Sequence, residues 1–187
     1  MRCPYCQNPL QAGAPECSAC RLTFPRASSL LGAVPRLSQT LADTLDVLLP
    51  AEHTRIRKRA GRIHWRFPQL TLQIVIHTFP PPHPLPLHTF WLFNAGAFAS
   101  GSKRGKNNHA ILLVVDPDRA EAALMPGYGL EELLHPDALG HLLELAGPAW
   151  AHQQWQEGIL RVLDGLDQLL ETAAIPRESG PANAAEF

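Results

Sequence analysis

The sequence predicts an α/β fold, a three-layer sandwich in which helices flank a mixed β-sheet, preceded by a small cysteine-rich element. All four cysteines lie near the N-terminus as two Cys-x-x-Cys pairs. Two strongly apolar segments, 70–79 and 110–116, have the β-branched and aliphatic composition of buried strands. Segments 50–67 and 155–169 repeat apolar residues at the spacing of one helix face.

Length and composition limit the classes of protein that this chain can be. It has 187 residues, of which 45% are hydrophobic, and a net charge of −1. This is enough for one core domain with an appendage, and it gives no overall attraction to nucleic acid or membranes. No apolar run approaches the ~20 residues of a membrane span, and none follows Met1. We therefore expect no transmembrane segment, no signal peptide and a cytoplasmic location.

The cysteine pairs are Cys3 with Cys6 and Cys17 with Cys20. Four thiolates are enough to close a tetrahedron around zinc, and a short segment needs such a metal because it cannot bury a core of its own. Two disulfides or a redox Cys-x-x-Cys are the alternatives, and both are less favoured without a signal peptide or a thioredoxin-like context. Residues 1–24 therefore predict a structural zinc ribbon, although Gln7 and Arg21 stand where such ribbons usually have glycine.

Residues 25–48 are expected to form a linker or an ordering segment. Their leucines at 37, 41, 45 and 48 fit a helix, and a short strand near 46–49 is the other interpretation. A helix should then begin at Pro50, with Glu52 in its first turn. Its apolar stripe is Ile56, Ala60, Ile63 and Phe67, and beside it runs a basic stripe of Arg55, Arg59, Arg62 and Arg66. The basic stripe could contact phosphate or acidic lipid, but a solvated helix face is the favoured interpretation.

The remaining segments predict the order helix, strand, helix, strand, strand, helix, helix. The strand at 70–79 precedes a proline-rich loop, so the next helix should begin only after Pro86. A hairpin joins the strands 110–116 and 120–125, and helices follow from about 136 and 155. His77, His83 and His88 around the proline-rich loop are either a second metal site or incidental. Residues 175–187 are expected to be disordered.

Three motifs identify a resemblance that covers residues 49–171. They are the basic segment ending in Asn107 and Asn108, the apolar run 111–115, and Gly127-Tyr128-Gly129 followed by Leu130 and Glu131. Together they resemble the TPM-domain family, with His109 in place of the usual glycine. The resemblance implies a TPM-like domain over 49–174. Within it, the glycines at 127 and 129 should allow Tyr128 to sit in a tight turn.

The resemblance further implies a shallow acidic depression that holds a divalent cation. Its ligands here would be Asp116, Asp118 and Glu131, with Asn108 adding a neutral oxygen and Asp137 nearby. Carboxylate oxygens suit calcium or magnesium. The alternative is that Asp116-Pro117-Asp118 is only a turn and that Glu131 favours the start of a short helix.

We interpret the chain as a non-catalytic interaction or assembly module with a protein partner. A nucleic-acid partner is less favoured, although the ribbon leaves it open. The alternative is a metal-dependent, phosphatase-like hydrolase of phosphomonoesters, with metal on Asp116 or Asp118 and phosphate on Arg119 or Lys106. The sequence shows no nucleophile beside a base, so enzymatic activity is the less favoured hypothesis.

Overall fold

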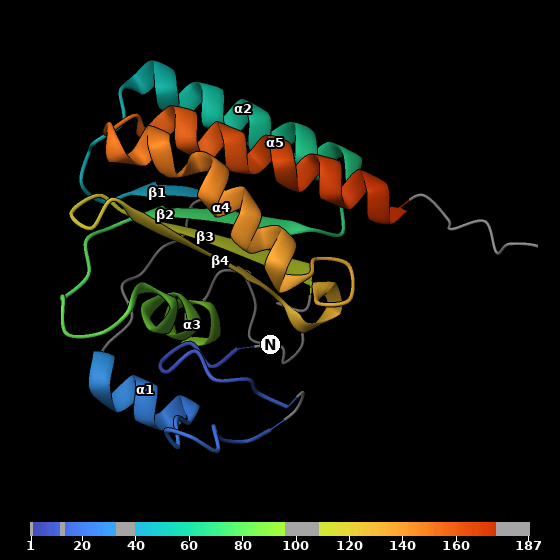
Figure 1. Cartoon of the computed structure of the whole chain (residues 1–187). Coiled ribbons are helices and arrows are strands. Elements are labelled where there is room, and N and C mark those ends of the chain that lie inside the picture. The colour runs from blue at the N-terminus through green and yellow to red at the C-terminus, as the bar shows by residue number, and fades with distance from the viewer. Residues whose placement is uncertain (1, 12–13, 33–39, 96–108, 175–187) are drawn as a thin grey trace, which may run out of the picture.

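The computed structural model describes residues 2–11, 14–32, 40–95 and 109–174. Its helices are α1 (Phe24–Leu31), α2 (Pro50–Arg66), α3 (Leu85–Ala95), α4 (Pro136–Ala151) and α5 (Trp155–Ala174). Its strands are β1 (Leu41–Asp43), β2 (Thr71–Ile76), β3 (Ala110–Asp116) and β4 (Glu121–Pro126), followed by a 3₁₀ turn, Tyr128–Leu130. From α2 onward, this is the predicted order of elements (Figure 1).

The four strands form one mixed sheet in the order β1-β2-β3-β4. β1, β2 and β3 are parallel, whereas β4 returns antiparallel to β3 as a hairpin. Every residue of β3 is buried, as its unbroken apolar sequence predicts for a strand covered on both faces. The mixed sheet is therefore confirmed, with β3 near its centre.

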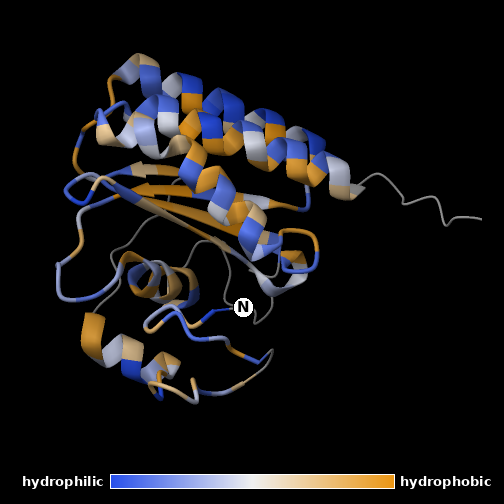
Figure 2. Cartoon of the chain, viewed as in Figure 1, coloured by the Kyte–Doolittle hydropathy of each residue, from blue (hydrophilic) through white to orange (hydrophobic). Residues whose placement is uncertain are grey.

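Helices cover both faces of the sheet and produce three layers. α2, α4 and α5 lie on one face, and α3 lies on the other, with α1 and the cysteine segment packed beyond α3 (Figure 1). The larger core cluster joins alternate residues of the strands, such as Ile74 and Leu113, to α2, α4 and α5. The smaller cluster joins the intervening residues, such as Val75 and Leu112, to α3. In Figure 2 the strands are coloured as hydrophobic, as expected for a sheet that helices cover on both faces.

The sequence of α2 explains how this helix sits on the sheet. Pro50 occupies its first turn, and the Glu52 carboxylate accepts a hydrogen bond from the Leu49 backbone N–H at 2.7 Å. The predicted stripe of Ile56, Ala60 and Ile63 is buried. One face of α2 therefore belongs to the core and the opposite face points to solvent.

The structure settles two boundaries differently from the sequence. Residues 25–48 contain α1 and a strand at Leu41–Asp43, rather than a helix through Leu41 or a strand at 46–49. Leu41 pairs with Ile74 and is buried, so the sheet decides the conformation here. α3 begins at Leu85, before Pro86, because the first turn of a helix tolerates proline. The expected tail, 175–187, lies outside the described residues.

Candidate functional site

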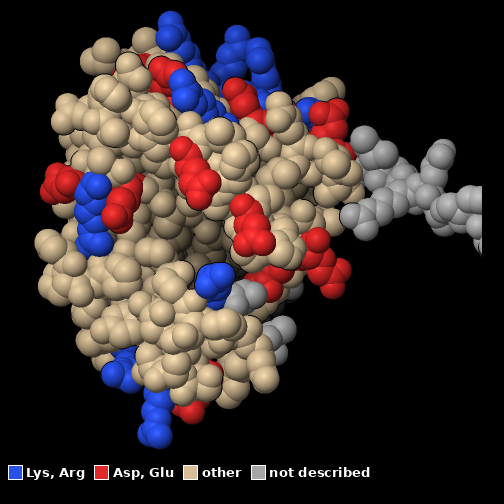
Figure 3. Space-filling model, in the orientation of Figure 1, with Lys and Arg blue, Asp and Glu red and all other residues tan. Residues whose placement is uncertain are grey.

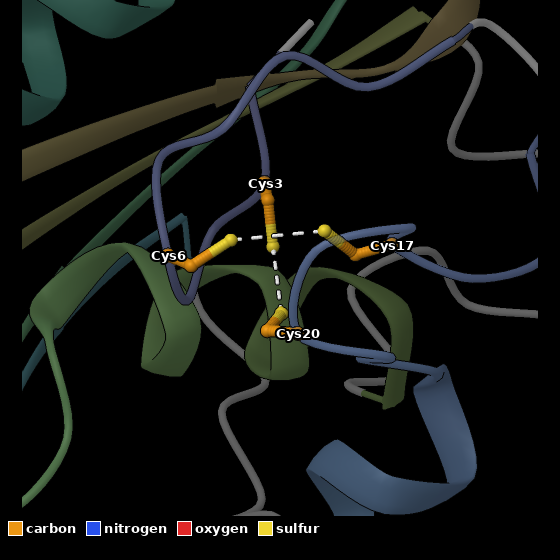
Figure 4. A group of neighbouring side chains, drawn as sticks. All are labelled: Cys3, Cys6, Cys17 and Cys20. Carbon is orange, nitrogen blue, oxygen red and sulfur yellow. Dashed lines mark hydrogen bonds between the residues drawn. The ribbon is translucent and has the colours of Figure 1, made fainter.

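The four cysteines converge on one point. The Sγ atoms of Cys3 and Cys20 are 3.6 Å apart, and those of Cys6 and Cys17 are 3.7 Å apart. All four sulfurs lie within 4.8 Å of one another, and they face a common centre in Figure 4. Thiolates bound to zinc at about 2.3 Å would leave sulfurs roughly 3.8 Å apart in a tetrahedron. The cluster therefore fits the closed ligand set of a zinc ribbon.

Two matching backbone turns aim the sulfurs inward. Gln7 N–H donates to the Cys3 carbonyl at 2.9 Å, and Arg21 N–H donates to the Cys17 carbonyl at 2.7 Å. Gln7 and Arg21 have φ of 60° and 56°, the left-handed conformation that usually selects glycine. The missing glycines therefore do not change the turn: both residues adopt the geometry at a local conformational cost.

Hydrogen bonds and burial affect the thiols in opposite directions. The backbone N–H of Asn8, and then its side-chain amide, donate to the Cys6 sulfur and lower the pKa of Cys6 to about 6. Burial raises the pKa of Cys20 to about 12 and also raises the pKa of Cys3. Zinc binds the thiolate form, so a metal must displace protons from the buried thiols as it binds.

The ribbon is attached to the domain through α1 and α3. Cys3, Cys17 and Leu22 share a buried cluster with Ala27 of α1 and Leu87 of α3. Aromatic contacts extend this interface: the Phe24 and Phe90 rings meet edge to face at 6.4 Å, and the Tyr5 ring lies 6.2 Å from that of His83. The ribbon and α1 therefore form an outer layer on α3.

The structure does not bring the predicted acidic ligands together. Asp116 ends β3 opposite Glu121, whereas Gly127 N–H donates to Ala110 O at the start of β3. Asp116 and Asp118 therefore lie at one end of the hairpin, and the turn that leads to Glu131 lies at the other, about 20 Å away for a strand of this length. Asn107 and Asn108 lie outside the described residues.

Asp116 has a structural environment. Its carboxylate is fully buried, accepts backbone N–H groups of Phe79 at 3.1 Å and Asp118 at 3.1 Å, and pairs with the Arg119 guanidinium at 3.2 Å. Arg119 also donates to the carbonyls of His83 and Pro80. The carboxylate thus fixes the proline-rich loop to the hairpin turn, which corresponds to the turn interpretation of Asp116-Pro117-Asp118.

The glycine turn after β4 also has a local explanation. Gly127 precedes the 3₁₀ turn with φ −75°, and Tyr128 is 66% exposed at its tip. Gly127 therefore does not use a positive φ, and Tyr128 sits in a tight turn. Glu131 follows the turn in helical conformation and Asp137 lies in the first turn of α4. The helix dipole favours an acidic residue at Asp137, whereas Glu131 ends the 3₁₀ turn and does not begin a helix.

A second cluster of polar residues, which the sequence did not indicate, lies at the carboxyl ends of the parallel strands. The buried Asp43 carboxylate accepts the backbone N–H groups of Leu45 and Leu48, and His53 Nε2 lies 3.4 Å from it. Thr44 Oγ1 lies 2.7 Å from His77 Nδ1. A lone Asp in a Leu-rich segment gives no sequence signal, because only the parallel pairing of β1 and β2 places it at this edge.

Comparison with known families agrees with this architecture. The family model of the TPM domain matches residues 42–169, which span the sheet and the helices α2 to α5. The chain belongs to the TPM-domain family. The match begins in β1, earlier than the boundary at residue 49 expected from the motifs, because β1 is a strand of the same sheet.

Solved structures share the fold of this TPM domain at low sequence identity. The solution structure of the N-terminal domain of a protein from P. gingivalis has a TM-score of 0.57 and 19% identity, covering 81% of this chain and 93% of that one. That of the N-terminal domain of a Corynebacterium glutamicum protein has a TM-score of 0.55 and 12% identity, covering 84% and 97%. No curated protein matches the sequence.

The longest helix, α5, has 20 residues and carries charges along its length. Within the described ranges, every helix is too short or too polar to cross a membrane.

Proposed function

We propose that the protein is a non-catalytic interaction module in which a structural zinc ion orders the ribbon and the TPM domain supports it. The closed set of four cysteines carries this proposal. It supplies every ligand that tetrahedral zinc needs and leaves no position for a substrate. Such a metal organises a surface rather than a reaction.

The ribbon and α1 provide a surface suited to a protein partner. Three of the nine large hydrophobic side chains exposed in the described structure belong to this layer: Tyr5 at 39%, Phe24 at 40% and Leu30 at 45%. Aromatic and aliphatic anchors of this kind carry much of the binding energy in protein interfaces. The buried contacts with α3 hold the layer in place, so that it is already organised when a partner binds.

The phosphatase-like alternative receives less support. In a phosphatase-like site the carboxylates would have to act on one phosphoryl group, but Asp116 and Glu131 lie at opposite ends of the hairpin. The Asp116 carboxylate is already engaged by three backbone N–H groups and by the Arg119 guanidinium. Calcium or magnesium at these loops therefore does not enter the proposal.

A pair of matched variants tests the interaction proposal in the full-length chain. Leu30→Glu places a charge on α1, and Leu145→Glu makes the same change at a comparably exposed position on α4, 52% exposed. Each tagged variant would be purified from the source cells and its retained proteins quantified by mass spectrometry. We expect at least one protein retained by the wild type and by Leu145→Glu to be depleted severalfold with Leu30→Glu.

The same preparations test the alternative. Hydrolysis of p-nitrophenyl phosphate would be followed with calcium and with magnesium, and the zinc content would be measured to confirm that the ribbon is intact. Turnover that requires the added cation and is lost in Asp118→Asn would contradict the proposal. An identical set of retained proteins for the wild type, Leu30→Glu and Leu145→Glu would also contradict the proposal.

A further inference from the structure

Helix α2 concentrates positive charge in a chain that is almost neutral overall. Six of the sixteen Lys and Arg residues lie on this one helix, with a single acidic residue, Glu52. Its net charge is therefore 6 − 1 = +5, against −1 for the whole chain. Figure 3 shows Lys and Arg side chains gathered along the edge of the molecule over α2.

Helix α5 neutralises only one flank of α2. Arg59 pairs with Asp164 and Asp167, and Arg66 pairs with Asp167 and Glu171. Arg55, Lys58 and Arg62 are exposed and form no ion pair with any described residue. The basic stripe seen in the sequence is thus divided into a paired half that attaches α2 to α5 and an outward half that faces solvent.

An exposed tryptophan completes the outward face. Trp65 is 84% exposed, the most exposed of the large hydrophobic side chains described. At 100° per residue it lies opposite the buried stripe of Ile56, Ala60 and Ile63 and in line with Lys58 and Arg62. We call Arg55, Lys58, Arg62 and Trp65 the α2 ridge; it is about 15 Å long at 1.5 Å per residue.

A pocket borders the ridge on the flank away from α5. It has a volume of about 550 Å³ and is lined by Arg57, Gly61 and His64 of α2 and by Thr40, Thr71 and Leu72 at the starts of β1 and β2. His64 Nδ1 lies 3.1 Å from the Leu70 carbonyl, which orients the ring and leaves Nε2 for another partner. A Cβ at Gly61 would meet no atom within 4 Å, so the pocket is open at this point.

We propose that the α2 ridge and its pocket bind single-stranded nucleic acid. The cations of the ridge would contact successive phosphates, Trp65 would stack on an unpaired base, and the pocket would take a further base through the His64 Nε2 acceptor and the threonine hydroxyls. A basic track with an aromatic stacking platform is how proteins bind single strands without sequence selection. This ligand lies across the sheet from the ribbon, so the inference goes beyond the proposed protein interaction.

The same features disfavour two other polyanions. A helix that lies in a membrane surface buries a continuous apolar face in lipid, but the apolar face of α2 already packs on the sheet, and Trp65 is alone on the outward face. A rigid duplex across the ridge would bring phosphates against Asp164 and Glu171, whose side chains are 60% and 57% exposed. A flexible strand can follow the ridge and avoid them.

Fluorescence anisotropy of the full-length zinc-loaded chain tests the proposal with labelled oligo(dT) and oligo(U) of about 20 nucleotides, since single-strand sites span roughly 4–16 nucleotides per small domain. We expect binding that weakens with salt, with a slope of about +2 in log Kd against log salt for three phosphate contacts. Trp65→Ala should weaken binding about tenfold, in the range measured for one stacked base. Arg62→Gln should weaken it severalfold and make the salt slope shallower.

Matched variants and probes decide the outcome. Tyr128→Ala removes another exposed aromatic side chain, and Arg161→Gln removes an arginine of α5 that pairs with Glu157; both should bind like the wild type. No binding at low salt, or binding unchanged by Trp65→Ala, overturns the proposal. Equal affinity for a duplex or for heparin, or selective binding to vesicles containing phosphatidylglycerol, overturns it as well. Because Trp65 is exposed, its replacement should leave the thermal unfolding of the chain unchanged.

Discussion

The ribbon and the α/β core of this protein are stabilised by different physical means. The ribbon is built around four cysteines that lie close together in the sequence and meet at one point, in a geometry that fits a metal ion. The core depends on buried strands whose partners lie far apart in the sequence, such as β2 with β3. Local ligation can be inferred from residue spacing, whereas the arrangement of a core site depends on strand order and register. Four predictions test this contrast, beginning with the largest effect.

Loss of the metal should unfold the ribbon and leave the core folded. In Cys17→Ser/Cys20→Ser, zinc content should fall from about one ion per chain to none, with loss of a binding free energy that is roughly 10 kcal/mol or more for structural zinc sites. Elemental analysis and amide NMR spectra would report the two regions separately. The control, Ser18→Ala, changes the same turn but no ligand. If core signals collapse together with those of the ribbon, the two regions are one cooperative unit and the contrast is wrong.

In the core, Asp116 should affect stability and not calcium affinity. Asp116→Asn removes one partner of a buried ion pair and weakens the acceptor of three backbone N–H groups, so we expect a loss of about 3 kcal/mol in the free energy of unfolding. Asp118 is exposed, and Asp118→Asn should stay within about 0.5 kcal/mol of the wild type. Urea unfolding measures both. Saturable calcium binding that Asp116→Asn abolishes, followed by NMR, would restore the cation-site hypothesis.

The core should also become less stable in acid because of His88. Burial, together with the nearby charges of Arg119 and His83, lowers the pKa of His88 from 6.5 to about 4. The unfolded chain therefore binds more protons between these values, so stability is complete above pH 6.5 and decreases as pH falls toward 4. The full shift corresponds to about 3 kcal/mol, which is the most that stability can lose through His88 as pH falls.

A matched variant isolates this contribution. His88→Phe keeps a ring beside Phe79, whose ring centroid lies 4.7 Å from that of His88, and removes the titrating group. The difference in unfolding free energy between wild type and variant should shrink or change sign as pH falls from 7 to 4.5. A difference that is constant with pH would show that His88 does not titrate in this range.

The smallest expected effect belongs to the ribbon backbone. Arg21 has φ 56°, so Arg21→Gly should relieve a cost of about 0.5–1 kcal/mol and increase zinc affinity a few-fold, whereas Arg21→Val should decrease it. Competition with a chromogenic chelator measures the change. Gln7→Gly, at φ 60°, is the matched test in the other turn. Equal affinities for the glycine and valine variants would mean that these turns carry no such cost.

Much of the structure could be predicted from local patterns. The ribbon cysteines, the buried stripe of α2 and the unbroken apolar run of β3 each report a local requirement: ligation, one buried helix face, and burial on both faces of a strand. The motif around Gly127 also identified the family correctly. The site residues outside the ribbon were less predictable. Asp116 and Glu131 lie close together in the sequence, but the hairpin between them carries them to opposite ends of β3.

The sequence by itself therefore determined the class of fold, the order of the main elements and the grouping of the four cysteines, because periodicity and spacing are local properties of the chain. Only the tertiary structure decided which charges are neutralised and which are exposed. Arg59 and Arg62 look equivalent in the basic stripe of α2, but α5 pairs with the first and leaves the second facing solvent beside Trp65. Pairing across 105 positions depends on how helices pack, and no local pattern encodes it.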